Sequence, residues 1–156
     1  MVSRATPSKN AKRRVSSAPR KTRSQPRAPA DPARIQLVRT EGTKGRGGGP
    51  DGEAWRIELD GKRCGTVFIN LIDEPPIGKH ASLQIYLNKA SQGRKIGRLG
   101  YAQAVALSKY DTIYAHMQKA NIASARAAEE AGFVELDPDA HRQKVMVWRR
   151  NASVQE

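Results

Sequence analysis

The segment LNKASQGRKIG at residues 87–97 is the stretch from which the rest of the chain can be interpreted. It follows the short apolar run SLQIYL at residues 82–87 and precedes an amphipathic pattern of helical spacing, so a strand passes through a glycine-containing loop into a helix. Unpaired backbone N–H groups at the start of a helix attract anions. Arg94, Lys95 and Arg98 add positive charge at the same place. The segment therefore predicts a phosphate-binding loop; an ordinary strand–helix connection with a solvated basic surface is the alternative.

The sequence on either side of this loop predicts a mixed α/β fold. Apolar spacing indicates a helix over residues 96–109, and TIYAHM at 112–117 indicates a buried strand. Asn121 is a suitable N-cap for a second helix over 122–131, which Gly132 would end. Further strands are predicted at residues 34–39, 54–59, 64–71, 82–87, 133–136 and 144–149. A strand–helix–strand unit requires parallel pairing, so we expect a mixed, mostly antiparallel central sheet with a β-α-β-α core.

A second segment, NIASARAAEEAGF at residues 121–133, is a helix of small residues that ends in Gly-Phe. In this order, the two segments resemble the GNAT superfamily of acetyl-CoA-dependent N-acetyltransferases. That family has a pyrophosphate loop of the form (Gln/Arg)-x-x-Gly-x-(Gly/Ala), which corresponds here to residues 92–97. It also has an Asn-x-x-(Ala/Ser) start to a helix that ends in Gly-Phe, which corresponds to Asn121 and Ser124. The resemblance covers about residues 54–149.

The resemblance implies an enzyme that takes an acetyl group from acetyl-CoA and transfers it to a primary amine by direct attack. In such a fold the strand ending at Leu87 diverges from the strand at 112–117, and the cofactor lies in the gap. The resemblance assigns the Leu87 backbone to the acetyl or pantetheine part, and Asn121 and Ser124 to the pantetheine side. It assigns the pyrophosphate to the backbone amides of seven successive residues: Gln92, Gly93, Arg94, Lys95, Ile96, Gly97 and Arg98.

The sequence also departs from the family pattern. Lys95 stands where the family has its first loop glycine, and Ala128 stands where many relatives have a tyrosine that protonates the leaving thiolate. The strand at 82–87 has no carboxylate that could act as a general base. Residues 41–53 contain six glycines and a proline, which predicts a flexible linker in place of the family's first two helices. The fold is therefore expected to be reduced at its N-terminal helical part, with an open acceptor side.

Few side chains are candidates for acid or base catalysis, and we select Tyr86 and His116. Tyr86 could donate a proton to the thiolate, and a histidine at the end of the strand 112–117 has a suitable ordinary pKa for a base. A structural role, which strand tyrosines and histidines more often have, is the alternative for both. Glu58 could reach the cleft through water or could simply face solvent. Cys64, the single cysteine, suits a small core position.

The positive charge of the chain is concentrated at its N-terminus. The net charge is +13 over 156 residues, and nine Lys or Arg residues fall within residues 1–30, which contain no acid. Residues 1–33 have almost no large apolar side chain and are predicted to be a disordered basic tail, followed by a GNAT-like domain at 34–150 and a C-terminal tail at 151–156. The basic tail could hold nucleic acid nonspecifically through phosphate charge; a solubilising tail is the alternative.

Composition excludes several classes of protein. A single cysteine excludes a disulfide framework, and no Cys/His cluster has zinc-finger spacing, so no metal is expected. No apolar run approaches the roughly 20 residues that span a membrane, and the N-terminus lacks an apolar secretory signal. Prolines in the basic tail argue against a mitochondrial transit helix, and we expect a cytoplasmic protein. The acceptor would be a small-molecule or protein amine; a GNAT-like binding or regulatory module with little turnover is the alternative function.

Overall fold

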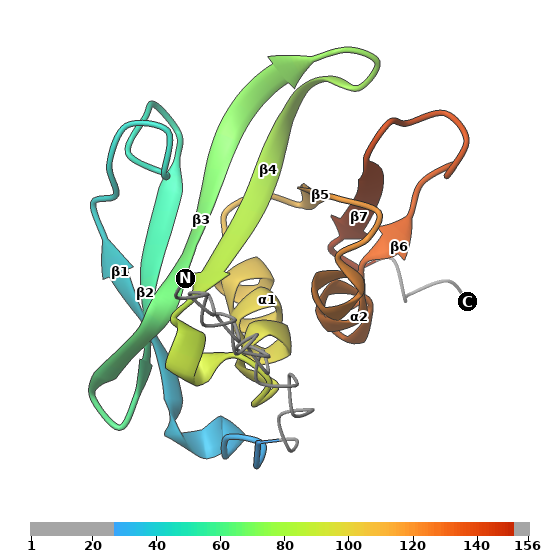
Figure 1. Ribbon diagram of the computed structural model, residues 1–156. Helices are drawn as coiled ribbons and strands as arrows, with labels where there is room; N and C mark the ends of the chain where they lie inside the picture. The colour runs from blue at the N-terminus through green and yellow to red at the C-terminus, as the bar shows by residue number, and fades with distance from the viewer. Residues whose placement is uncertain (1–26, 152–156) are drawn as a thin grey trace, which may run out of the picture.

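The computed structural model describes residues 27–151, and within them one seven-stranded sheet carries two α-helices (Figure 1). The elements are β1 (Ile35–Thr40), β2 (Glu53–Leu59), β3 (Lys62–Glu74), β4 (Gly78–Leu87), α1 (Ile96–Leu107), β5 (Thr112–Met117), α2 (Ile122–Glu130), β6 (Val134–Glu135) and β7 (Lys144–Arg149), with short 3-10 helices η1 (Pro32–Arg34) and η2 (Lys89–Ser91). The strand order is β1-β2-β3-β4-β5-β7-β6, and β4–β5 is the parallel pair. The mixed, mostly antiparallel sheet predicted from the sequence is confirmed.

Both helices pack on the same face of the sheet. A Cβ placed on Gly100 of α1 would lie 2.6 Å from Ile85 Cδ1 and 3.2 Å from Ile57 Cδ1, so the helix backbone lies directly on β4 and β2. Tyr101 of α1 contacts Phe133, which follows α2, edge to face with 5.6 Å between ring centroids. These apolar contacts join the helices and one sheet face into a single core.

The opposite face of the sheet is partly covered by the glycine-rich loop between β1 and β2. The Gly47 N–H donates to Asn70 Oδ1 at 2.7 Å, and Asn70 Nδ2 donates to the Gly45 carbonyl at 2.7 Å. The loop is close enough that a Cβ on Gly47 would lie 2.2 Å from the Glu53 carbonyl oxygen. The sequence predicted a flexible linker here; instead one asparagine side chain on β3 supplies the hydrogen bonds that hold this loop against the sheet.

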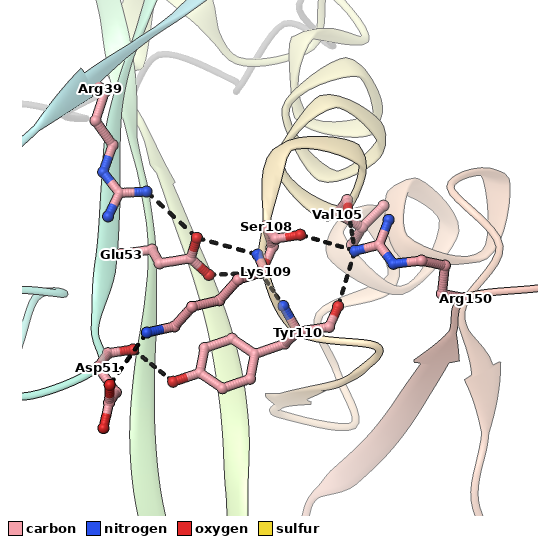
Figure 2. Close-up of polar contacts among 8 residues, drawn as sticks. All are labelled: Arg39, Asp51, Glu53, Val105, Ser108, Lys109, Tyr110 and Arg150. Carbon is pink, nitrogen blue, oxygen red and sulfur yellow. Dashed lines mark hydrogen bonds and ion pairs between the residues drawn. The ribbon is translucent and has the colours of Figure 1, made fainter.

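A polar network fixes the end of α1 that leads into β5 (Figure 2). The buried Glu53 carboxylate accepts hydrogen bonds from Ser108 Oγ at 2.5 Å, from the Lys109 N–H at 3.3 Å and from Arg39 at 3.3 Å. Arg150 donates to three carbonyl oxygens at the same turn, those of Val105, Ser108 and Tyr110. Because Ser108, Lys109 and Arg39 satisfy the Glu53 carboxylate, this carboxylate has a structural role and is not available as a base.

Most predicted elements agree with the structure, and the differences are local. The strand β5 has the predicted bounds, and α1 begins at the predicted residue, Ile96. The strand β4 begins at Gly78, four residues before the predicted start, because buried His80 lies in a strand position that its polarity concealed. Residues 1–26 and 152–156, which hold most of both predicted tails, lie outside the described residues.

Residues 27–33 belong to the segment predicted as a tail, and the structure gives them defined contacts. Ala30 is buried in the core, and its N–H donates to the Arg94 carbonyl at 2.9 Å. Asp31 caps η1, because its Oδ1 accepts from the Ala33 N–H at 3.0 Å. Neither described α-helix has both the length and the hydropathy needed to cross a membrane.

Candidate active site

The start of α1 has unpaired hydrogen-bond donors and no side-chain cap. Lys95 occupies the N-cap position with a left-handed backbone (φ +59°), and its side chain makes no cap hydrogen bond. The first turn contains no acidic residue. The first backbone N–H groups of a helix have no intrahelical partner, and the helix dipole adds partial positive charge there. Together with the Arg94, Lys95 and Arg98 side chains, this end of α1 is suited to an anion.

Three elements converge at this helix start. A Cβ placed on Gly97 would lie 3.7 Å from Ala127 Cβ of α2 and 3.8 Å from Leu87 Cδ1 at the end of β4. Gly93 has φ +76°, and a Cβ on it would meet nothing within 4 Å, so there is open space beside the loop at this residue. The structure therefore groups all seven predicted pyrophosphate residues in the loop and first turn that follow Leu87.

The start of α2 differs, because its donors are used within the protein. Asn121 Oδ1 accepts from the Ser124 N–H at 3.2 Å and caps the helix. The Ser124 hydroxyl lies 3.0 Å from the Tyr101 hydroxyl of α1. Burial raises the pKa of Tyr101, and the Ser124 hydrogen bond opposes that shift. Asn121 is thus the N-cap of α2, as predicted, and Ser124 links α2 to α1.

A pair of histidines bridges the two strands that diverge. The strands β4 and β5 pair only at Ala81–Ile113 and Ser82–Tyr114. His80 Nε2 lies 2.9 Å from His116 Nε2, and His80 Nδ1 lies 2.7 Å from the Gly78 carbonyl oxygen. This pair lies on the sheet face opposite α1, because His80 alternates along β4 with residues that face the helix.

The surroundings of His116 lower its affinity for a proton. Burial is the main cause of its lowered pKa, and the neighbouring His80 adds to the shift. Glu74 opposes the shift, whereas His141 increases it. His116 is therefore neutral at pH 7, which is the form that accepts a proton.

His116 lines a cavity of about 600 Å³ on the same face. Its walls come from the β3–β4 hairpin, the end of β5 and the β6–β7 loop, and include Glu74, Pro75, Lys119, His141 and Arg142. Ser82, on the same sheet face, has a buried hydroxyl with no partner among residues 27–151. The cavity thus presents an imidazole and mixed charges to an entering molecule.

The structure separates the two predicted catalytic residues. Tyr86 is 54% exposed, its ring stacks on Phe68 at 6.0 Å between centroids, and the Arg46 guanidinium lies 5.5 Å from its ring centroid. Tyr86 therefore shares no contact with His116. Glu58, the other acidic candidate, pairs with Arg56 at 3.1 Å.

Sequence reasoning missed His80, Ser82 and Tyr101. His80 lies outside the strand predicted at residues 82–87, so its pairing with His116 could not be read from the sequence. Ser82 and Tyr101 acquire their surroundings only through packing between elements, which no local sequence pattern indicates.

The described residues thus combine diverging parallel strands, an uncapped basic helix start and a histidine beside a cavity on the far face. The model of the Acetyltransferase (GNAT) family matches residues 19–133, and the chain belongs to this family. It is an acyl-CoA N-acyltransferase that uses acetyl-CoA. Among curated protein sequences, none matches the chain significantly.

Solved structures with the same fold are acetyltransferases. The aminoglycoside acetyltransferase AAC(6')-Ib, solved with coenzyme A and kanamycin, has a TM-score of 0.56 and 18% identity, over 65% of this chain and 69% of that chain. The spermidine N-acetyltransferase SpeG from Vibrio cholerae has a TM-score of 0.53 and 22% identity, over 67% of this chain and 68% of that chain.

The residues present fit acetyl-CoA. The uncapped donors at the start of α1 and the open space beside Gly93 leave room for a pyrophosphate. Lys95 narrows the approach relative to a glycine, but its left-handed backbone is the conformation that a glycine would take. The backbone N–H groups of residues 93–98 would hold the phosphates, and Leu87 would lie beside the acyl end.

Proposed function

We propose that this acetyltransferase transfers the acetyl group to a primary amine that enters the cavity lined by His116 and attacks directly. The observation that carries this proposal is the His80–His116 pair, which bridges β4 and β5 on the face opposite the helices. Acetyl-CoA supplies the acetyl group as a thioester, and its conversion to an amide releases the free thiol.

The hydrogen bonds at the pair define which nitrogen of His116 is basic. The Gly78 carbonyl can only accept, so His80 Nδ1 carries a proton and donates to it. In the neutral ring His80 Nε2 is then an acceptor, and His116 Nε2 must donate to it. His116 Nδ1 is therefore left with a free lone pair and takes the proton from the attacking amine. His80 positions the ring through this hydrogen bond.

The charges around the cavity favour an amine with further polar groups. Glu74 can pair with a cationic amine, whereas Lys119 and Arg142 attract an anionic group elsewhere on the acceptor. The neighbours act on aminoglycosides and on spermidine according to their names, so we propose such polyamines and aminoglycosides as the first acceptors to test.

The test is a thiol-release assay with acetyl-CoA and a panel of amines on the full chain. His116→Gln should lower kcat by about 100-fold, because a positioned general base contributes roughly 10²–10⁴. His141→Gln, which changes the same cavity outside the pair, should alter KM for the acceptor more than kcat. An unchanged kcat in His116→Gln would contradict the assignment. Acetyl-CoA binding without thiol release for any amine would favour the binding-module alternative.

The pH dependence provides a second check. Because the pKa of His116 is lowered from 6.5, the acidic limb of kcat should lie below pH 6.5 and should disappear in His116→Gln. The folded chain binds fewer protons at this site than the unfolded chain, so stability should be full above about pH 6.5 and should decrease as the pH falls through the lowered pKa. Urea unfolding at several pH values measures the second effect.

A further inference from the structure

Residues 27–30, here called the strap, lie across the loop that precedes α1. Arg27 NH1 donates to the Lys89 carbonyl at 2.9 Å and to the Gln92 carbonyl at 3.3 Å. The Ala30 N–H donates to the Arg94 carbonyl at 2.9 Å. Three carbonyl oxygens of the phosphate-binding loop are thus directed toward the strap.

The orientation of these carbonyls determines where the loop amides point. In a trans peptide the C=O and the following N–H point in opposite directions. The Gln92 carbonyl shares its peptide plane with the Gly93 N–H, and the Arg94 carbonyl shares its plane with the Lys95 N–H. Because both carbonyls face the strap, the Gly93 and Lys95 N–H groups face away from it, toward the open side where Gly93 has free space.

The strap is itself held by a second hydrogen bond to the loop and by burial of Ala30. Arg94 Nε donates back to the Ala28 carbonyl at 3.2 Å, and the Ala30 side chain is 5% exposed within the core. The chain then continues through η1 into β1. The strap is therefore anchored to the sheet and forms the rear support of the loop.

We propose that the strap is a positioning element for acetyl-CoA binding, and that Arg27 is its principal residue. Arg27 fixes two peptide planes of the loop from behind, so that the Gly93 amide is oriented for a phosphate before the ligand arrives. This proposal rests on the cofactor site proposed for residues 93–98.

The experiment compares the full chain with Arg27→Ala and with Arg23→Ala, which removes an equal charge four residues earlier. We expect Arg27→Ala to weaken coenzyme A binding by about five- to tenfold in calorimetry, because a charge-assisted hydrogen bond is lost, and Arg23→Ala to change it by less than about twofold. Arg27→Lys should restore part of the affinity. In the absence of coenzyme A, hydrogen exchange at the Ala30 amide, which donates to the Arg94 carbonyl, should accelerate only in Arg27→Ala.

The outcomes separate the two proposals. Unchanged affinity and exchange in Arg27→Ala, with normal binding by the unmodified chain, would overturn the role of the strap alone. Equal weakening by both alanine variants would assign the effect to charge and would also overturn it. Tighter coenzyme A binding by Arg27→Ala would show that the strap obstructs the site, which would also overturn the proposal. If the unmodified chain does not bind coenzyme A, the cofactor site and the strap proposal both fail.

Discussion

The helices α1 and α2 begin in opposite ways, although each directly follows one strand of the diverging pair β4 and β5. The start of α2 is closed by a side chain, because Asn121 accepts from the Ser124 N–H. The start of α1 has Lys95 at the same position, with no side-chain cap and a left-handed backbone that favours glycine. Capping typically stabilises a helix by about 1 kcal/mol, so α1 lacks a stabilisation that α2 has.

The difference separates a structural helix start from one suited to binding. Unpaired donors, nearby cations and the absence of a first-turn acid make α1 receptive to phosphate. In α2 the corresponding groups connect to Tyr101 and hold the two helices together. Exchanging the properties of the two helix starts is therefore the most informative way to test the assignment.

The largest effect is expected from Lys95→Asp. Aspartate tolerates a left-handed backbone, and its charge would occupy the helix start in place of a phosphate. Coenzyme A binding should weaken by at least about 30-fold, which corresponds to about 2 kcal/mol, whereas the folded chain should gain about 0.5 kcal/mol from the helix dipole. Calorimetry and urea unfolding measure the two effects.

Lys119→Asp is the matched control, because it makes the same charge change two residues before Asn121. It should weaken coenzyme A binding by less than about threefold, since that helix start is capped. Equal weakening by the two variants would mean that overall charge, and not the start of α1, controls binding.

A smaller effect is expected at the capped end. Asn121→Ala should lower the free energy of unfolding by about 1 kcal/mol, and Asn121→Asp should retain the stability, because a carboxylate also accepts from the Ser124 N–H. Urea unfolding checks both. If Asn121→Ala is as stable as the unmodified chain, the cap has no energetic role. A loss of coenzyme A affinity in both variants would identify a contact from the side-chain amide.

The smallest effect is expected from Lys95→Gly. A non-glycine residue in the left-handed region costs about 1 kcal/mol, and the flexibility of glycine in the unfolded chain offsets about half of this. The variant should gain about 0.5 kcal/mol in unfolding free energy, and its coenzyme A affinity should change by less than about threefold, because the wider approach offsets the lost charge. A clear loss of stability would show that the Lys95 side chain contributes contacts that outweigh the strain.

Sequence periodicity was sufficient to predict an element where the residues that determine it are close together in the sequence. The strand β5 and the start of α1 follow directly from apolar spacing, and Asn121 was identified as a cap by its residue type. The predicted start of β4 was wrong, because the polar residue His80 is buried in the strand through its contact with His116, 36 positions away. The loop after β1, predicted to be a flexible linker, has defined contacts, because Asn70 on β3 bonds it to the sheet.

The candidate site was only partly accessible from the sequence. Glycines and cations in one loop indicate an anion site from local order alone, and the structure groups them at the start of α1. The His80–His116 pair depends on which positions of β4 and β5 meet, which pattern does not specify. The strap depends on hydrogen bonds from the Arg27 side chain and the Ala30 N–H to loop carbonyls, which no sequence periodicity indicates.

The central claim is that the uncapped start of α1 holds the phosphates of acetyl-CoA. Titration of the ¹⁵N-labelled full chain with coenzyme A, followed by amide chemical shifts, tests it most directly. The account predicts that the largest shifts occur at the amides of Gly93 through Arg98 and are lost in Lys95→Asp. Saturating coenzyme A that leaves these amides unshifted would contradict it.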